Sequence, residues 1–231
     1  MTENNKPKPS ALIVWGGWDG HQPKEVAEIF ADELIKNGFE VEVSDTLDAF
    51  LDADKLKQLS LIVPVWTMGT ITPEQLNPVL EAVKSGVGIA GCHGGMCDSF
   101  RNETEWQFMT GGQWVAHPGN DGVEYEVRIT DTAHPITQGA PKTFGVKSEQ
   151  YYMHTDPANH ILAVTQFPVA DGPHLKNGTY DMPVMWTRYY GEGRVYYNAL
   201  GHQANIVSQS EVLPIMVRGL LWAAHGDALS G

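Results

Sequence analysis

Residues 11–17 read ALIVWGG, and this stretch decides the fold class. An unbroken apolar run that ends in Gly-Gly is typical of a strand buried on both faces of a parallel sheet. A helix is predicted to follow, because Pro23 suits its first turn and Gly38 can end it in a left-handed conformation. Residues 39–43 then alternate between apolar and polar side chains. They predict a second strand and therefore a βαβ unit with a right-handed crossover.

The same pattern recurs further along the chain. Residues 59–66 (LSLIVPVW) form a second apolar run, in which Pro64 predicts either the end of the strand or a local bulge. Residues 72–75 (TPEQ) form a capping-box sequence with proline at the first helical position, so a helix is predicted from there to about Gly86. A short strand is expected at residues 87–91. Repeated strand–helix units predict an α/β fold with a parallel sheet.

The second half of the chain consists of short alternating segments separated by Gly, Pro and Asn turns. Strands are predicted at residues 125–130, 161–167, 184–187 and 194–199, partly as antiparallel pairs beside the parallel sheet. A last helix is expected from Ser210, as its cap, to about His225. Because no repeat or linker interrupts the pattern, we expect a single domain over residues 11–231, preceded by a flexible polar tail at residues 1–10.

Composition limits the classes of function. The 231 residues are 42% hydrophobic, enough for a core, and the formal net charge of -13 disfavours nucleic acids and anionic membranes as partners. No apolar run approaches the roughly 20 residues of a membrane helix, and residues 1–10 lack the apolar region of a secretion signal. The two cysteines, Cys92 and Cys97, fit free thiols better than a disulfide. These features predict a cytoplasmic protein.

Three histidines follow predicted strands in glycine-rich loops. His21 ends the sequence WGGWDGH after the first strand, His93 begins HGG after residues 87–91, and His202 ends LGH after the last strand. Because ligands of open α/β sheets bind at the carboxyl ends of the strands, these loops predict a pocket. Four further loop residues are expected to border a ligand there: Trp15, Gly17, Trp66 and Gly94.

Residues 91–95 (GCHGG) have the layout of a nucleophile elbow, in which a strand, a tight turn and a helix expose a central side chain between small neighbours. The central residue is His93, which indicates acid/base chemistry, substrate binding or metal ligation. Cys92 would point back into the fold. Alternatively, the glycines only turn the chain and His93 is a hydrogen-bonded surface residue.

Glu149 and Tyr151, in the sequence EQYY, form the other candidate group. A carboxylate beside phenols can serve as a general base or bind sugar hydroxyls, although glutamates are more often exposed loop residues. His117 and His154 are expected to border the same pocket. The remaining histidines, His134, His160, His174 and His225, have no spacing that indicates a function.

The sequence lacks three common cofactor-binding and catalytic motifs. There is no phosphate-binding loop, no G-x-G-x-x-G and no G-x-S-x-G. A divalent metal ion held by His21, His93 and His202 stays open as an alternative, but no H-x-x-H or C-x-x-C spacing supports it. No cofactor is therefore assigned from the motifs.

The order of the motifs resembles the ThuA-like family, named for trehalose utilisation, over about residues 11–225. The resemblance rests on the glycine-rich and histidine motifs at residues 15–21, 91–95, 111–118, 134–139, 149–151, 183–188, 191–197 and 200–202. It implies a flavodoxin-like fold similar to that of class I glutamine amidotransferases. Those enzymes have a cysteine at the elbow, where this chain has His93, so the resemblance implies no glutamine hydrolysis by a thiolate.

The resemblance further implies work on carbohydrates, in the catabolism of trehalose and related disaccharides as oxidised (3-keto) glycosides made by a partner dehydrogenase. A ketone at C3 acidifies the neighbouring C–H. We hypothesise that His93 or Glu149 removes this proton. His21 or His202 would polarise the carbonyl or protonate the leaving oxygen, and a divalent metal would stabilise the enolate.

Two alternatives compete with this enzyme. A non-catalytic sugar-binding or regulatory module with a degenerate amidotransferase pocket would have the same fold. A thiol-based hydrolase would depend on Cys92 or Cys97. The expected ligand is a small carbohydrate, for which the acidic balance favours a neutral sugar, and the sequence is compatible with a homo-oligomer.

Overall fold

The first half of the sheet is parallel in the computed structural model, which describes residues 8–225. Five strands lie in the order β2-β1-β3-β4-β11, with all neighbours parallel. They are β1 (Ser10–Gly17), β2 (Glu40–Ser44), β3 (Leu61–Thr67), β4 (Gly88–Cys92) and β11 (Gly193–Asn198). This 2-1-3-4-5 pattern is the flavodoxin-like order, so the predicted α/β class and its parallel strands are confirmed.

The second half of the sheet is an antiparallel extension. From β11 the sheet continues through β10, β9, β6 and β7, all paired antiparallel. Their bounds are β6 (Val123–Ile129), β7 (Thr143–Ser148), β9 (His160–Phe167) and β10 (Tyr180–Tyr190). A separate antiparallel pair joins β5 (Gly112–Ala116) to β8 (Tyr152–Thr155). The four strands predicted in this half correspond to β6, β9, β10 and β11. Strands β5, β7 and β8 were not predicted.

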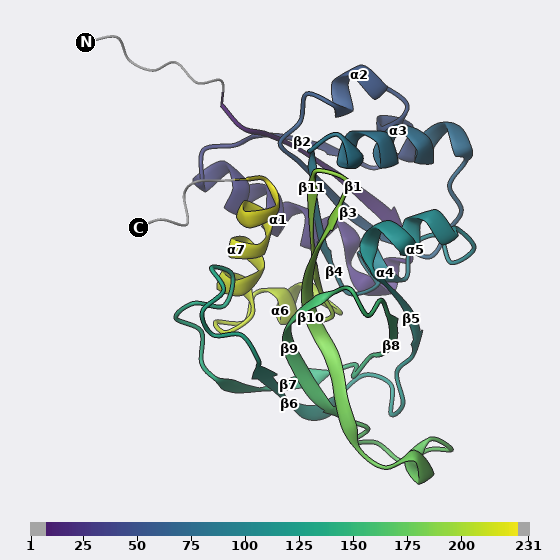
Figure 1. Cartoon of the computed structure of the whole chain (residues 1–231), viewed down its shortest axis with the longest axis vertical. Helices are drawn as coiled ribbons and strands as arrows, with labels where there is room; N and C mark the ends of the chain where they lie inside the picture. Colours follow the sequence, from purple (N-terminus) through teal and green to yellow (C-terminus); the bar gives the residue numbers. More distant parts are fainter. Residues whose placement is uncertain (1–7, 226–231) are drawn as a thin grey trace.

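Helices cover both faces of the parallel half. Figure 1 shows α1 and α7 on one side of the sheet, and α3 and α5 on the other. The longer helices are α1 (Pro23–Lys36), α3 (Pro73–Lys84), α5 (Thr104–Thr110) and α7 (Leu213–Ala223). Short turns of helix are η1 (Asp19–His21), η2 (Leu47–Phe50), α2 (Ala53–Leu56), α4 (Gly94–Cys97), η3 (Leu175–Asn177) and α6 (Ala204–Val207).

Local chemistry explains the main boundaries. The Thr72 side chain accepts a hydrogen bond from the Gln75 N–H, and the Gln75 side chain accepts one from the Thr72 N–H, so the predicted capping box starts α3. Gly38 follows α1 at a φ of 85°, which is the left-handed conformation predicted for it. Four residues of β1, at positions 11–14, are at most 1% exposed, as a strand covered on both faces requires.

Two boundary predictions were wrong. Pro64 does not end β3, because the strand runs on to Thr67, and its register with β1 contains no bulge. The β4 ladder pairs only with Leu61 and Ile62, so at Pro64 the strand pairs with β1 alone and lacks the neighbour on its other side. Ser210 does not cap the last helix. Its hydroxyl bonds the Glu211 carboxylate, and α7 begins at Leu213.

The predicted tail at residues 1–10 falls largely on residues 1–7, which lie outside the described part of the chain. Its last residue, Ser10, is the first of β1. Among the helices of residues 8–225, none combines the length and apolar character needed to cross a membrane.

Candidate functional site

The carboxyl ends of the parallel strands bring the three loop histidines together. His21 closes η1 after β1, His93 lies between β4 and α4, and His202 follows β11. Their ring centroids are 4.7 Å (His21–His93), 5.1 Å (His21–His202) and 5.4 Å (His93–His202) apart. The strand-end rule therefore places these three side chains correctly in space.

His93 occupies the central position of an elbow. Its φ of 51° and ψ of -140° are uncommon for a residue with a side chain. A Cβ at Gly91 would come within 3.0 Å of Met96 Cβ, and one at Gly95 within 3.0 Å of Val65 Cα. The turn consequently requires small neighbours, as the sequence indicated. The His93 N–H donates to Asn198 O at 2.7 Å, which fixes the turn to β11.

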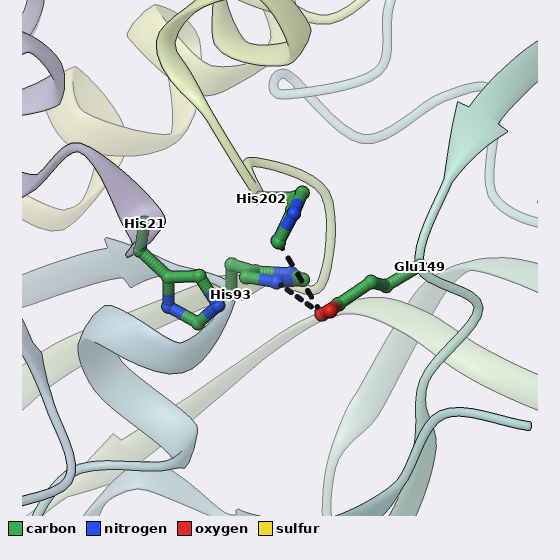
Figure 2. Close-up of side chains that lie close together, drawn as sticks. All are labelled: His21, His93, Glu149 and His202. Carbon is green, nitrogen blue, oxygen red and sulfur yellow. Dashed lines mark hydrogen bonds and ion pairs between the residues drawn. The ribbon is translucent and has the colours of Figure 1, made fainter. Parts of the chain in front are cut away.

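Glu149 joins the histidines from the antiparallel half of the sheet, just after β7. Its Oε2 lies 3.1 Å from His93 Nε2 and 3.4 Å from His202 Nδ1. One donor atom from each of His21, His93, His202 and Glu149 lies within 4.8 Å of those of the other three. We call these four residues the histidine–glutamate cluster (Figure 2). Its members are at most 8% exposed, so they form a buried polar centre.

Two imidazoles of the cluster are held by a hydrogen bond at their second nitrogen. His93 Nδ1 lies 2.8 Å from the Ala199 carbonyl oxygen, and His21 Nδ1 lies 2.8 Å from Thr67 Oγ1. His202 Nε2 lies 3.9 Å from an Asp121 carboxylate oxygen. These contacts orient the remaining nitrogens toward the centre of the cluster.

Burial and mutual charge set the protonation of the cluster. Burial, reinforced by the neighbouring imidazoles, lowers the pKa of His21 to about 3, and burial also lowers the pKa of His93. Burial opposes ionisation of Glu149, but His202 and His93 outweigh it and hold the Glu149 pKa well below its usual range. Burial likewise disfavours the charged form of His202, yet the Glu149 carboxylate raises the His202 pKa. Within the cluster, the shifts therefore favour the ionised form of Glu149 and disfavour the charged forms of His21 and His93.

A cavity of about 140 Å³ opens beside the cluster. Two members of the cluster, His21 and Glu149, line this cavity. His117 also lines it, with its Nε2 3.7 Å from Glu149 Oε1. The other lining residues are Trp18, Thr67, Met68, Asp98, Arg101, Trp114 and Tyr151. The cavity thus combines acid/base groups with aromatic walls.

A family model described as ThuA, trehalose utilisation, matches residues 10–223. The chain belongs to the ThuA family. A comparison with curated proteins found no match.

Several solved structures have a fold similar to that of this ThuA-family chain. A ThuA-like protein from Bacteroides uniformis superposes with a TM-score of 0.76 at 17% identity, covering 96% of this chain and 95% of its own. Another from Parabacteroides merdae gives 0.69 at 20% identity, with 96% and 91% covered. A cytoplasmic protein of Salmonella typhimurium gives 0.58 at 14% identity, with 95% and 98% covered. At these identities the likeness concerns the fold alone.

The other residues that we expected at the site of this ThuA-family chain divide into two groups. Tyr151 stacks on His93 at 4.0 Å between centroids and, like His117, lines the cavity. The cavity wall does not include Trp15, Gly17, Trp66 or Gly94, and His154 is exposed and lines a different hollow.

Two of these residues act on the site through packing. A Cβ at Gly94 would lie 2.6 Å from the His21 ring, so only glycine leaves room for that ring. Gly17 approaches the Thr67 carbonyl, where a Cβ would collide with the backbone.

Sequence reasoning missed several cavity residues. Trp18 and Trp114 lie in glycine-rich loops that we noted, but rings in such loops could equally pack in the core. Asp98 and Arg101 follow the elbow helix and pair at 2.6 Å, with the guanidinium 4.7 Å above the Trp114 ring. Nothing in the local pattern of residues 98–101 indicates that this pair faces a cavity.

The two cysteines do not line the cavity. Cys92 and Cys97 are free and buried, and burial raises the pKa of Cys92 to about 12. Because the thiolate is the nucleophilic form, neither side chain is suited to act as a nucleophile.

Proposed function

We propose that this ThuA-family chain is an enzyme of disaccharide utilisation that cleaves oxidised (3-keto) trehalose-type glycosides by acid/base chemistry. The observation that carries the proposal is the position of the Glu149 carboxylate, at a cavity wall and surrounded by imidazoles. Enzymes that remove a proton next to a carbonyl need such a positioned base. The family description, trehalose utilisation, supplies the substrate class.

The reaction that fits these groups is an elimination. Glu149 Oε1, the carboxylate oxygen turned away from His93 and His202, takes the proton from C2, next to the C3 ketone. The electron pair of the C2–H bond forms a C1–C2 double bond, and the C1–O bond to the leaving sugar breaks. His117, 3.7 Å from Oε1, protonates the leaving oxygen and recovers its proton from Glu149. The products are an unsaturated 3-keto sugar and a free sugar, with no oxidant or reductant consumed.

His93 is a positioning residue in this scheme. It is 1% exposed and lies behind Glu149, outside the cavity wall. Its contact with Glu149 Oε2, together with that of His202, places Oε2 inside the cluster and leaves Oε1 for the substrate. A displaced carboxylate would lose the reactive geometry, which is sensitive to shifts of about 1 Å.

The cavity matches one oxidised sugar ring. Trp18 and Trp114 supply flat apolar faces, and the Asp98–Arg101 pair supplies polar partners for hydroxyl groups. At about 140 Å³ it is smaller than the roughly 300–1,000 Å³ of most ligand pockets, so the second sugar would lie at the mouth. The net charge of -13 favours a neutral glycoside.

A dehydrogenase that oxidises C3 must supply this substrate. Free, buried cysteines are the usual state in a reducing compartment, so we place the enzyme in the cytoplasm with that dehydrogenase.

The test compares trehalose with 3-keto-trehalose in deuterated buffer. The protein should release glucose only from the keto sugar and should exchange the C2 proton for deuterium. Glu149→Gln should reduce both rates by about 100-fold or more. Glu126→Gln, a change at an exposed glutamate of β6, should leave them unchanged.

Two outcomes would overturn the proposal. Equal cleavage of trehalose and its keto derivative would show that the ketone is not used. Binding of the keto sugar without exchange or cleavage would identify a non-catalytic sugar-binding module.

A further inference from the structure

Two hydrogen-bond acceptors face each other inside the histidine–glutamate cluster. The Ala199 carbonyl can only accept a hydrogen bond, so His93 Nδ1 carries the proton that it donates there. The neutral ring then presents the Nε2 lone pair to the Glu149 carboxylate at 3.1 Å. Two acceptors at this distance repel unless a positive centre lies between them.

His202 also points a ring nitrogen at the same carboxylate oxygen. Its Nδ1 lies 3.4 Å from Glu149 Oε2 and is a buried nitrogen with no hydrogen-bond partner. The side chain is about nine-tenths buried or more, at 5% exposure. An unpartnered buried nitrogen aimed at a shared point is costly unless something occupies that point.

The outer contacts of two of the imidazoles follow one pattern. Two rings hold an oxygen with their second nitrogen, the Ala199 carbonyl for His93 and the Thr67 hydroxyl for His21, each at 2.8 Å. The second nitrogen of His202 faces the exposed Asp121 carboxylate at the longer distance of 3.9 Å. Histidines that bind metals almost always hold their other nitrogen in this way, because it fixes the ring and the tautomer.

The inner distances match a metal coordination shell. Ligand atoms about 2.0–2.1 Å from a four-coordinate ion lie about 3.4 Å apart. The contacts of Glu149 Oε2 with His93 and His202 are 3.1 and 3.4 Å. All four donors lie within 4.8 Å of one another, so the widest pair must close by up to about 1.4 Å to reach the tetrahedral spacing.

We propose that the histidine–glutamate cluster binds one divalent first-row transition-metal ion. Three imidazoles and one carboxylate suit Zn²⁺, Fe²⁺, Co²⁺ or Ni²⁺ better than Mg²⁺ or Ca²⁺, which prefer oxygen ligands. His21 and Glu149 also line the cavity, so the ion is reachable from it and can accept a substrate oxygen as a further ligand. Bound to the C3 ketone oxygen, the ion would stabilise the enolate of the proposed reaction.

Only this catalytic role rests on the proposed function, because metal binding is measured without any substrate. Protein treated with a chelator and dialysed is titrated with Co²⁺, whose d–d absorption reports imidazole coordination, and with Zn²⁺ by calorimetry. We expect saturation at one equivalent. Glu149→Gln and His202→Gln should each weaken binding about 100-fold or more, and Thr67→Val, which removes only the support of His21, about 10- to 100-fold.

The matched control is His160→Ala. His160 lies on the surface beside Asp131 and His134, where imidazoles and a carboxylate also meet. This variant should bind the ion as tightly as the unaltered protein. Binding lost in His160→Ala but kept in Thr67→Val and Glu149→Gln would overturn the proposal, as would the absence of stoichiometric binding.

Two further measurements distinguish a misfolded variant from a lost metal site, and a failed metal site from a failed reaction. Zn²⁺ should raise the melting temperature of the unaltered protein and of Thr67→Val, but not that of Glu149→Gln. One-equivalent binding without turnover of 3-keto-trehalose would leave the metal site standing and refute the proposed reaction. Full turnover in excess chelator, with no binding, would refute the metal site and leave the reaction standing.

Discussion

Replacing Gly94 with alanine tests how closely the cluster is packed. The added Cβ would lie 2.6 Å from His21 Cε1, 2.8 Å from its Nδ1 and 2.9 Å from Thr67 Cγ2. Because non-bonded carbons rest about 3.5–4.0 Å apart, the ring must move by about 1 Å. The 2.8 Å contact between His21 Nδ1 and Thr67 Oγ1 would not survive this movement. Gly94 is not among the residues with a positive φ, so the effect is steric rather than conformational.

The expected loss has two parts. Overpacking a close-packed site lowers the free energy of unfolding by about 1–3 kcal/mol, or about 2–4 °C in melting temperature per kcal/mol for a domain of this size. Displacing His21 by about 1 Å should reduce turnover of the keto sugar about 100-fold. Urea denaturation and steady-state kinetics measure these losses.

Gly145→Ala is the matched control for Gly94→Ala, since a Cβ at Gly145 in β7 meets no atom within 4 Å. It should leave stability and turnover within about 0.5 kcal/mol and twofold of the original. Unchanged stability and turnover in Gly94→Ala would refute the tight packing of His21 against the elbow.

Three further predictions concern pH, sugar contact and the thiols. In chelator-treated protein, lowering the pH from 6.5 to 4 should reduce the free energy of unfolding by up to about 1.4 kcal/mol per pH unit through His21. The pKa of His21 in the folded protein is about 3, so the unfolded chain takes up the proton first as the pH falls. Urea denaturation of His21→Asn should show a smaller change in the free energy of unfolding per pH unit, and an equal change would contradict this. Trp18→Ala should raise KM for the keto sugar about tenfold with little change in kcat, because the exposed ring is a binding wall; an unchanged KM would remove it from the binding site. Native protein should resist iodoacetamide, and Cys92→Ser should keep most turnover, since that thiol is buried with a pKa near 12; rapid labelling with loss of turnover would favour a thiol mechanism.

The parallel half of the fold could be predicted because its signals are local. An apolar run, a helix cap and a closing glycine each act within a few residues, as at Gly38 and the Thr72–Gln75 box. The antiparallel half depends on pairing between distant segments. The β5–β8 pair joins Gly112 to Thr155, a contact that no local pattern specifies.

The site shows the same division. The positions of His21, His93 and His202 follow from the strand-end rule, because neighbouring parallel strands end at one edge of the sheet. Glu149 enters from β7, at the far edge of the nine-stranded sheet, so its position depends on how the antiparallel strands curve back toward the elbow. The sequence could identify this residue as a candidate, but not its 3.1 Å contact with His93.

His93, the central residue of the elbow, does not line the cavity. A φ of 51° at a residue with a side chain costs about 1–3 kcal/mol, and the surrounding structure must compensate for it. The N–H of His93 bonds Asn198 O at 2.7 Å and its Nδ1 bonds Ala199 O at 2.8 Å. Both bonds aim Nε2 at Glu149 and away from solvent. The strained turn therefore fixes the direction of Nε2 inside the protein, which serves an ion bound in the cluster better than attack on a substrate.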